Sequence, residues 1–281
     1  MTSATQPTVA LTRAEPGALF PLTADARFLR HLVAYEGCPF ATLEGRSGDI
    51  LFHFGRRALF HLEPEHARLR CAFTTFPDPV SERVLLDTVL WTTSLQLGFE
   101  LLHASAVTTD GGVLALVADQ GGGKSTLAAE FLRRGATLFA DDVVALEATG
   151  DTVLGHCGPA VMNLPVAVDE ATVGSVTVLA RFEDERWVQL PAVAQPPAPL
   201  SAIVLLRRSA GESLQCRLIP ATTLTLLPFA IALPHMTARG RRRFDRFGQL
   251  AAVTPVLELT ADLTTPVADL ADAVQLQVET L

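Results

Sequence analysis

Lysine is almost absent from this chain. Of the 22 basic residues in the 281-residue sequence, one is a lysine, Lys124, and the other 21 are arginines. A GC-rich codon bias explains most of such a skew. The single retained lysine nevertheless indicates a position where a compact ammonium is needed rather than a planar guanidinium.

Net positive charge, cysteine pairs and long apolar runs are also missing. A formal net charge of −8 argues against a general nucleic-acid binder, which needs a basic face. The four cysteines, Cys38, Cys71, Cys157 and Cys216, form no CxxC pair, so we expect buried, inert thiols and no zinc site. No apolar run of 18 or more residues is free of charges and turn signals, and no signal-peptide pattern is present. We therefore expect a cytoplasmic protein with no membrane partner.

The composition, 49% hydrophobic and 19% charged, is that of a globular protein. Short apolar runs between turn signals predict a β-rich region over 1–79, with an unpatterned tail or edge strand in 1–24 and paired strands at 50–54 and 57–62. Residues 80–281 are expected to form an α/β unit. Apolar spacing predicts its helices over 80–99, 125–134, 220–232 and 237–253, and a last one marked by Val267, Leu270, Val274 and Val278. The expected strands are 103–107, 113–118, 137–140, 143–146 and 201–208, with a proline-rich connector over 191–200.

The strongest chemical signal is the segment VLALVADQGGGKSTLAAEF, residues 113–131. An apolar strand leads into a glycine-rich turn and then into a helix that begins with Lys-Ser-Thr. Such a loop binds phosphate, because its backbone N–H groups and the helix N-terminus face the anion and the lysine reaches the β and γ oxygens. The residues expected to bind nucleotide are Gly121, Gly122, Gly123, Lys124, Ser125 and Thr126. Ala118 stands where the full pattern has glycine.

Two polar features flank this loop. His103 opens the strand before it, and Asp141-Asp142 follow the strand after its helix. A strand–helix–strand unit predicts that strands 113–118 and 137–140 are adjacent and parallel, with Asp141 near the γ-phosphate. A core histidine and a solvated turn are the structural alternatives, and the neighbouring phosphate loop favours the functional interpretation. The loop by itself does not separate kinases, ATPases and GTPases.

The stretch from His103 to Leu146 resembles the catalytic domain of bacterial HPr kinase/phosphorylase and of shorter HPr-kinase-like proteins. The residues that carry the resemblance are His103, Gly121 to Ser125, Arg134-Gly135 and Asp141 to Val144. The resemblance is looser over the rest of the chain. It implies an α/β P-loop kinase core, a central mixed sheet with helices, over 80–281, preceded by the β-rich region.

The resemblance also implies roles for individual residues. Asp141 would be the general base that accepts the proton of a substrate hydroxyl, with His103 and Lys124 beside it as catalytic residues. Ser125 and Asp142 would hold Mg²⁺. The chain departs from the family downstream of the Asp pair, where GHCGPAVMNLP (155–165) lacks the glutamate that HPr kinases carry. This departure argues against HPr as the substrate and against the phosphorylase reaction.

The resulting prediction is a kinase that uses ATP and Mg²⁺ to phosphorylate a hydroxyl, a serine on a peptide or small protein. Short relatives of this kind are associated with peptide natural-product pathways, including lasso-peptide clusters, which makes a precursor peptide one candidate. One alternative is a nucleotide-binding regulatory or scaffold protein without transfer activity, suggested by Ala118 and the missing glutamate. Another is a kinase of a free small molecule such as an amino acid. Homo-oligomerisation, the choice of nucleotide and the role of residues 1–79 stay open.

Arginines also cluster late in this acidic chain. The cluster consists of Arg239, Arg241, Arg242, Arg243 and Arg246. One interpretation is a solvated helix face. The other is a contact for phosphate or for an acidic peptide, with a subunit boundary as one place for it. The sequence does not indicate which of the five points inward.

Overall fold

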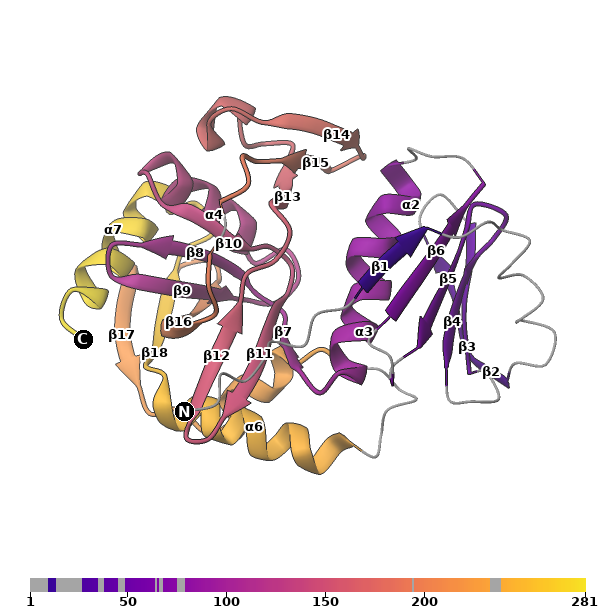
Figure 1. The fold of residues 1–281 in the computed structure, drawn as a ribbon. Coiled ribbons are helices and arrows are strands. Elements are labelled where there is room, and N and C mark those ends of the chain that lie inside the picture. The colour runs from indigo at the N-terminus through magenta and orange to yellow at the C-terminus, as the bar shows by residue number, and fades with distance from the viewer. Residues whose placement is uncertain are drawn as a thin grey trace. The chain divides into compact units, whose positions relative to one another are not determined.

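The computed structural model describes residues 10–13, 27–34, 38–44, 49–63, 65, 68–74, 79–193, 195–232 and 239–281. The chain divides into two compact units (Figure 1). The first is Met1–Gly98 with Leu233–His235, and the second is Phe99–Ala232 with Met236–Leu281. The sequence patterns place the boundary after residue 79, whereas the first compact unit continues to Gly98.

The N-terminal unit contains a six-stranded sheet in the order β1-β6-β5-β4-β3-β2. Its strands are β1 (Ala10–Arg13), β2 (Arg27–Ala34), β3 (Cys38–Glu44), β4 (Ile50–Phe54), β5 (Ala58–Glu63) and β6 (Arg68–Phe73). The paired strands and the early edge strand expected from the sequence are confirmed, since β4 pairs with β5 and β1 lies at the sheet edge, parallel to β6.

A helical stretch follows in the same unit. It consists of α2 (Pro79–Val84), the π-helical turn η3 (Leu85–Val89) and α3 (Leu90–Gln96). Val84 and Val89 are buried in the same core as Phe52 and Phe60 of the sheet. The helix expected over 80–99 therefore ends three residues early, because Gly98 takes a left-handed φ of 103° that ends helical geometry.

The second unit, here called the P-loop unit, is built on a nine-stranded sheet. Seven strands follow the order β10-β8-β9-β16-β12-β11-β7, while β18 pairs with β16 and β17. The strands are β7 (Glu100–Leu102), β8 (Ser105–Thr109), β9 (Gly112–Val117), β10 (Thr137–Ala140), β11 (Val144–Thr149), β12 (Thr152–His156), β16 (Ala198–Arg208), β17 (Gln215–Ile219) and β18 (Val256–Ala261). β9, β16 and β18 run parallel, and the other pairings are antiparallel. The expected α/β class with a mixed central sheet is confirmed.

The expected adjacency of strands 113–118 and 137–140 is wrong. β8 lies between β9 and β10 and is antiparallel to both. The reason is the tight hairpin at Thr109–Gly112, which pairs β8 with β9 before helix α4 (Lys124–Arg133) crosses to the next strand. β10 still runs in the same direction as β9, so Asp141 at its end remains on the same sheet edge as the phosphate loop.

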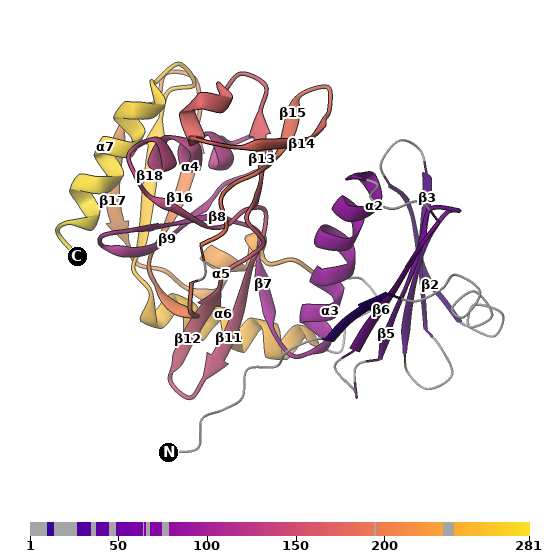
Figure 2. The same cartoon turned by 45° about the horizontal axis from the view of Figure 1, so that its top comes forward.

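Helices cover both faces of this sheet (Figures 1 and 2). Alternate side chains of β9 point to opposite faces, as strand geometry requires. Leu114 and Leu116 join a core with α4 and α7 (Val267–Val278), and Ala115 joins the opposite core with α6 (Gly240–Val253). The helix expected over 125–134 and the final amphipathic helix are both confirmed by α4 and α7.

A separate three-stranded sheet, β13-β15-β14, packs on the α4 side of the unit. Its strands are β13 (Val161–Pro165), β14 (Thr177–Arg181) and β15 (Glu185–Gln189), with the 3₁₀ turn η4 (Glu170–Val173) between β13 and β14. Met162 and Leu164 of β13 are buried in the core that contains α4. Asn163, which lies between them along the strand, is thereby brought to Asp141 and Asp142.

The segment after β17 contains less helix than expected. In place of a helix over 220–232, the chain forms α5 (Thr223–Leu226) and the 3₁₀ turn η5 (Leu227–Phe229). The helix begins after Thr222, not at Pro220, because Thr222 and Thr225 form a capping box. Pro228 has no N–H to continue α-helical hydrogen bonds, so the helix stops there.

Smaller differences concern element ends. β16 begins at Ala198, inside the expected proline-rich connector. α6 begins at Gly240, and the first residues of the helix expected over 237–253 lie outside the described residues. Within the part of the chain that is described, no helix combines the length and apolar character needed to cross a bilayer.

Candidate active site

The phosphate loop connects β9 to α4. Gly121 and Gly123 have left-handed φ angles of 73° and 98°, which favour glycine. Gly123 is the N-cap of α4 and provides no side-chain cap, so the first N–H groups of the helix face outward without a side-chain acceptor. The loop therefore offers the backbone donors and the helix dipole that bind phosphate.

Ala118 fits this loop without strain. Asp142 is the one non-glycine residue with positive φ among the described residues, so Ala118 has ordinary backbone geometry. A Cβ added to Gly122 would lie 2.8 Å from Cβ of Ala118 and 2.9 Å from the carbonyl oxygen of Asp119. Glycine at 122 is thus required opposite the alanine at 118.

Lys124 is 8% exposed and its Nζ donates a hydrogen bond to the carbonyl oxygen of Ala118 at 3.3 Å. The ammonium therefore lies at the first residues of the loop. Burial lowers the pKa of Lys124, while the carboxylates of Asp142, Asp141 and Asp119 oppose that shift. In phosphate-binding loops of this pattern, a lysine at this position reaches the β and γ phosphate oxygens. Lys124, the single lysine of the chain, occupies that position.

Asp141 lies at the end of β10 and contacts the phosphate-loop helix. Its Oδ1 accepts hydrogen bonds from Ser105 Oγ at 2.5 Å and from Ser125 Oγ at 3.4 Å, and its Oδ2 accepts one from the backbone N–H of Asn163 at 2.8 Å. Burial and the neighbouring Asp142 carboxylate raise the pKa of Asp141. The hydrogen bonds from Ser105 and Asn163 partly offset this rise, because they favour the charged form.

Asp142 takes a left-handed φ of 64°, which an aspartate tolerates in a tight turn. Its backbone carbonyl accepts from the N–H of Ala104 at 3.2 Å, and its Oδ2 accepts from Nδ2 of Asn163 at 2.5 Å. The turn therefore holds two adjacent carboxylates toward β8 and β13. No third His, Cys, Asp or Glu joins them within the described residues.

His103 precedes β8 and is half-buried. Its backbone N–H donates to the carbonyl oxygen of Phe229 at 2.7 Å. Burial lowers the pKa of the imidazole, the Lys124 ammonium lowers it further, and the Asp142 carboxylate opposes both. The structure thus brings His103 into the electrostatic field of the loop lysine and the Asp pair.

Two residues of this site, Ser105 and Asn163, were not found from the sequence. Ser105 is fully buried, and its spacing of two from His103 along an extended strand is a signal that would have placed both on one face. Asn163 gave no such signal, since it lies on a strand that apolar patterning did not reveal. Its Oδ1 is buried and accepts no hydrogen bond from the part of the chain that the structure describes.

Of the other residues predicted to bind nucleotide, Gly122 lies within the loop, and its N–H donates to the Asp119 carbonyl at 2.9 Å. Thr126 lies in the first turn of α4. All six predicted loop residues are therefore contiguous around one helix N-terminus.

Arg134-Gly135, which contributed to the family resemblance, connects α4 to α7. Arg134 donates to Glu130 Oε1 at 2.8 Å, to Asp272 Oδ1 at 2.6 Å and to the Ala268 carbonyl at 2.8 Å. Gly135 has a φ of 97° and ends α4. This pair of residues therefore supports the loop helix and does not reach the loop itself.

The arginine cluster separates into inward and outward members. Arg239 Nη2 lies 2.9 Å from Glu100 Oε1, and Arg243 Nε lies 3.4 Å from Glu100 Oε2, on a carboxylate whose side chain is 3% exposed. Arg241 and Arg242 are exposed. Two of the five arginines are thus held by a buried glutamate within the P-loop unit.

The cysteine prediction is correct in part. Cys71 is buried, and burial raises the pKa of its thiol to about 12. Cys157 is exposed, with Sγ donating to the Gln195 carbonyl at 3.2 Å, so the expectation of burial is wrong there. The reason is that Cys157 lies beyond the end of β12, outside the core. The side chain of Cys38 lies outside the described residues.

Comparison with known proteins supports the motif-based resemblance. The chain is 29% identical over 154 residues to the HPr kinase/phosphorylase of Burkholderia lata, and 29% identical over 161 residues to that of Ralstonia pickettii. The chain is similar to HPr kinase/phosphorylase. Each alignment covers 53% of this chain and 45% of the relative, so the chain matches about half the length of these curated relatives.

The structure of the HPr(Ser) kinase/phosphatase from Coxiella burnetii aligns with 62% of this chain and 93% of its own, at 13% identity and a TM-score of 0.35. No family model matches the chain. The resemblance to HPr kinases is thus borne out by sequence similarity over about half of the chain.

Proposed function

We propose that this chain is an HPr-kinase-like phosphotransferase that moves the γ-phosphate of ATP to the hydroxyl of a serine in a peptide or small protein. The observation that carries the proposal is the 3.4 Å contact between Ser125 Oγ of the phosphate loop and Oδ1 of Asp141. This contact unites a phosphate-binding element with a carboxylate base in one site. The similarity to HPr kinase/phosphorylases supports the same reaction class.

The residues of the site fit a magnesium ion. Mg²⁺ prefers oxygen ligands and keeps several waters, so it needs few protein donors. Ser125, Asp142 and Asn163 would hold it, and the buried Oδ1 of Asn163 is an additional oxygen to which no described residue donates a hydrogen bond. When bound, the ion would neutralise charge on the β and γ phosphates.

Asp141 would serve as the base. In the transfer, the acceptor oxygen forms a bond to the γ-phosphorus, the bond from that phosphorus to the β–γ bridging oxygen breaks, and ADP leaves. The hydroxyl proton passes to a carboxylate oxygen of Asp141. A raised pKa suits this residue to accept a proton near neutral pH, and Ser105 and Asn163 fix the orientation of its carboxylate.

Lys124 would bind β and γ oxygens through Nζ after leaving the Ala118 carbonyl. A neutral His103, whose pKa burial and Lys124 lower, adds no second positive charge beside Lys124. It can hydrogen-bond a phosphate oxygen or the acceptor hydroxyl. Lys124 thus exchanges the Ala118 carbonyl for phosphate oxygens, while His103 is already beside it.

The test is incubation of the protein with γ-labelled ATP, Mg²⁺ and peptides encoded beside its gene. We expect label on a serine of a peptide or small protein. Label on free serine alone would instead select a small-molecule kinase. Tight ATP binding without label on any acceptor would select the scaffold alternative, for which the strain-free Ala118 removes one of the two original arguments.

A further inference from the structure

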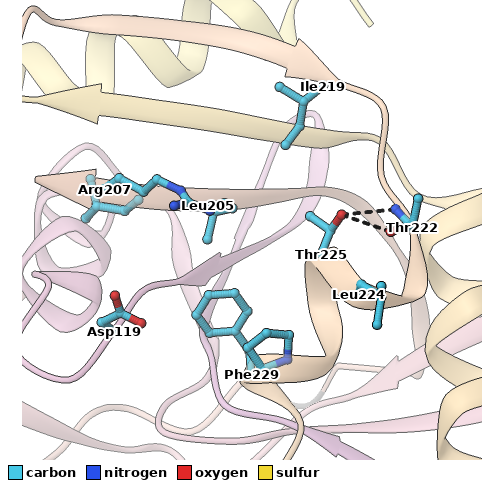
Figure 3. A pocket seen from close by; sticks show the side chains of 10 residues that line it. Asp119, Leu205, Arg207, Ile219, Thr222, Leu224, Thr225 and Phe229 are labelled. Carbon is cyan, nitrogen blue, oxygen red and sulfur yellow. Dashed lines mark hydrogen bonds between the residues drawn. The ribbon is translucent and has the colours of Figure 1, made fainter.

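A pocket of about 440 Å³ opens beside the phosphate loop (Figure 3). Asp119 of the loop lies on one side of it, Leu224 of α5 lies on the other, and Phe229 of η5 lies between them. Leu205 and Arg207 at the end of β16 complete the wall. All of these residues belong to the P-loop unit, and no role above uses the pocket; we call it the Asp119 pocket.

The Asp119 pocket adjoins the end of the loop where transfer would occur. Lys124 Nζ donates a hydrogen bond to the carbonyl of Ala118, the residue that precedes Asp119. The ammonium that would bind the β and γ oxygens is therefore close to the Asp119 side of the pocket. The carbonyl of Phe229 accepts the backbone N–H of His103 at 2.7 Å, which connects the pocket wall to the other side of the site. A ligand in this pocket would therefore lie beside the loop that the proposed function assigns to phosphate binding.

Apolar side chains form one part of the pocket wall, namely Leu205, Leu206, Ile219, Leu224, Pro228 and Phe229, and Asp119, Arg207, Thr222 and Thr225 form the rest. The hydroxyl of Thr225 accepts the N–H of Thr222 at 3.1 Å, and the two hydroxyls lie 3.4 Å apart, so they hydrogen-bond within the α5 cap (Figure 3). Arg207 is paired with Glu258 at 3.3 Å. Leu224 at the rim is 70% exposed. A ligand that covers this side chain would gain the favourable free energy of burying apolar surface.

We propose that the Asp119 pocket binds a bulky apolar side chain adjacent in sequence to the serine that is phosphorylated. This inference rests on the proposed function and adds its substrate class: peptide segments that carry Ser beside Leu, Ile, Met or Phe. Free serine has no apolar group to contact the part of the wall formed by Leu205, Leu224 and Phe229, so a peptide with an apolar residue beside its serine fits this pocket better.

The first experiment uses a library of peptides with a fixed central serine, phosphorylated by the full-length protein with Mg²⁺ and ATP. We expect selection of large apolar residues next to the serine. Leu224→Asp should raise the peptide KM about tenfold or more without changing the ATP Kd, because one apolar side-chain contact is lost. The matched control is Leu276→Asp in α7, where the leucine is 69% exposed and distant from the loop in sequence. This variant should change neither the peptide KM nor the ATP Kd.

Two outcomes of that experiment would overturn the proposal. One is a library without any preference next to the serine. The other is an Leu224→Asp protein that binds ATP more weakly but tripolyphosphate normally, which would assign the pocket to the nucleotide base.

A second measurement separates this proposal from the proposed function. A peptide with photoleucine beside its serine is irradiated with the protein and Mg²⁺·AMP-PNP, and the labelled residues are mapped by mass spectrometry. Crosslinks to Leu224, Pro228 or Phe229 support the pocket even if no phosphate is transferred, whereas crosslinks elsewhere or none overturn it. Failure of transfer with every acceptor would overturn the proposed function alone.

Discussion

Ser105 donates its hydroxyl hydrogen to Oδ1 of Asp141 across 2.5 Å, from the strand β8 that lies between β9, which leads into the phosphate loop, and β10, which precedes Asp141. The insertion of β8 between β9 and β10 thus has a local consequence. It provides a buried hydroxyl that donates a hydrogen bond to the proposed base.

Ser105→Ala should lower kcat about tenfold while leaving the ATP Kd unchanged. A hydrogen bond to a charged group contributes about 1.5–3 kcal/mol, and its loss frees the carboxylate of Asp141 to rotate. Steady-state kinetics with the labelled peptide measures both constants. Ser201→Ala on β16, which removes a hydroxyl bonded to the Val113 carbonyl, is the control and should keep wild-type kcat. Equal kinetics for both variants would contradict the positioning role of Ser105.

Gly122→Ala should weaken ATP binding by about tenfold or more, because the new Cβ would lie 2.8 Å from Cβ of Ala118 and would distort the loop. Titration calorimetry with Mg²⁺·ATP gives the dissociation constant. Gly111→Ala in the preceding hairpin has its nearest contact at 3.5 Å and should bind normally. Normal binding by Gly122→Ala would show that the loop relaxes around alanine.

Glu100→Gln should destabilise the P-loop unit by about 3 kcal/mol, since it removes the buried charge on which Arg239 and Arg243 converge. Urea unfolding measures the loss. Arg241→Gln, on the exposed side of the same helix, should change stability by less than about 0.5 kcal/mol. A ligand-binding role for Arg239 would instead predict that its replacement weakens substrate binding with little effect on unfolding.

Glu130 provides a pH-dependent contribution to stability. The hydrogen bond from Arg133 is the largest cause that lowers the pKa of Glu130 to about 2, and Arg134 adds to it. A depressed folded-state pKa stabilises the protein above the ordinary value of 4.5, and the effect is lost as the pH falls toward about 2.

Glu130→Gln should therefore cost on the order of 2 kcal/mol at pH 7, and its difference from wild type should shrink between pH 4.5 and about 2. Denaturant midpoints measured across that range test the sign. The exposed Glu183→Gln serves as control. A difference that stays constant with pH would mean that Glu130 acts by packing alone.

The sequence was sufficient for features that depend on neighbouring residues. Strand, glycines, Lys124 and helix are contiguous, so their pattern predicts the phosphate loop and α4 directly. The contacts of Asn163 could not be predicted, because its partner Asp141 lies more than twenty positions earlier in the chain. The neighbouring Met162 and Leu164 are ordinary apolar core residues and give no signal of a site. The turn at Asp110-Gly111 is a local signal that β8 pairs with β9, whereas the pairing of β10 with β8 depends on distant residues and is not determined by local patterns.

The arginine cluster shows the same limit. Its position on a helix was predictable, but the choice of Arg239 and Arg243 as inward residues depends on Glu100, more than a hundred residues earlier in the chain. The predicted helix over 220–232 failed for a local reason that was available in the sequence, the Thr222–Thr225 capping box and Pro228.

The central claim is that Asp141 is the base of a phosphate transfer carried out on the loop of Lys124. The most direct test compares Asp141→Asn with Lys124→Ala, measuring ATP affinity by calorimetry and label transfer to the peptide acceptor on the same preparations. Asp141→Asn should keep the ATP Kd within about twofold of wild type and lose about a thousandfold in transfer rate, whereas Lys124→Ala should lose both. Transfer by Asp141→Asn at the wild-type rate would contradict the account.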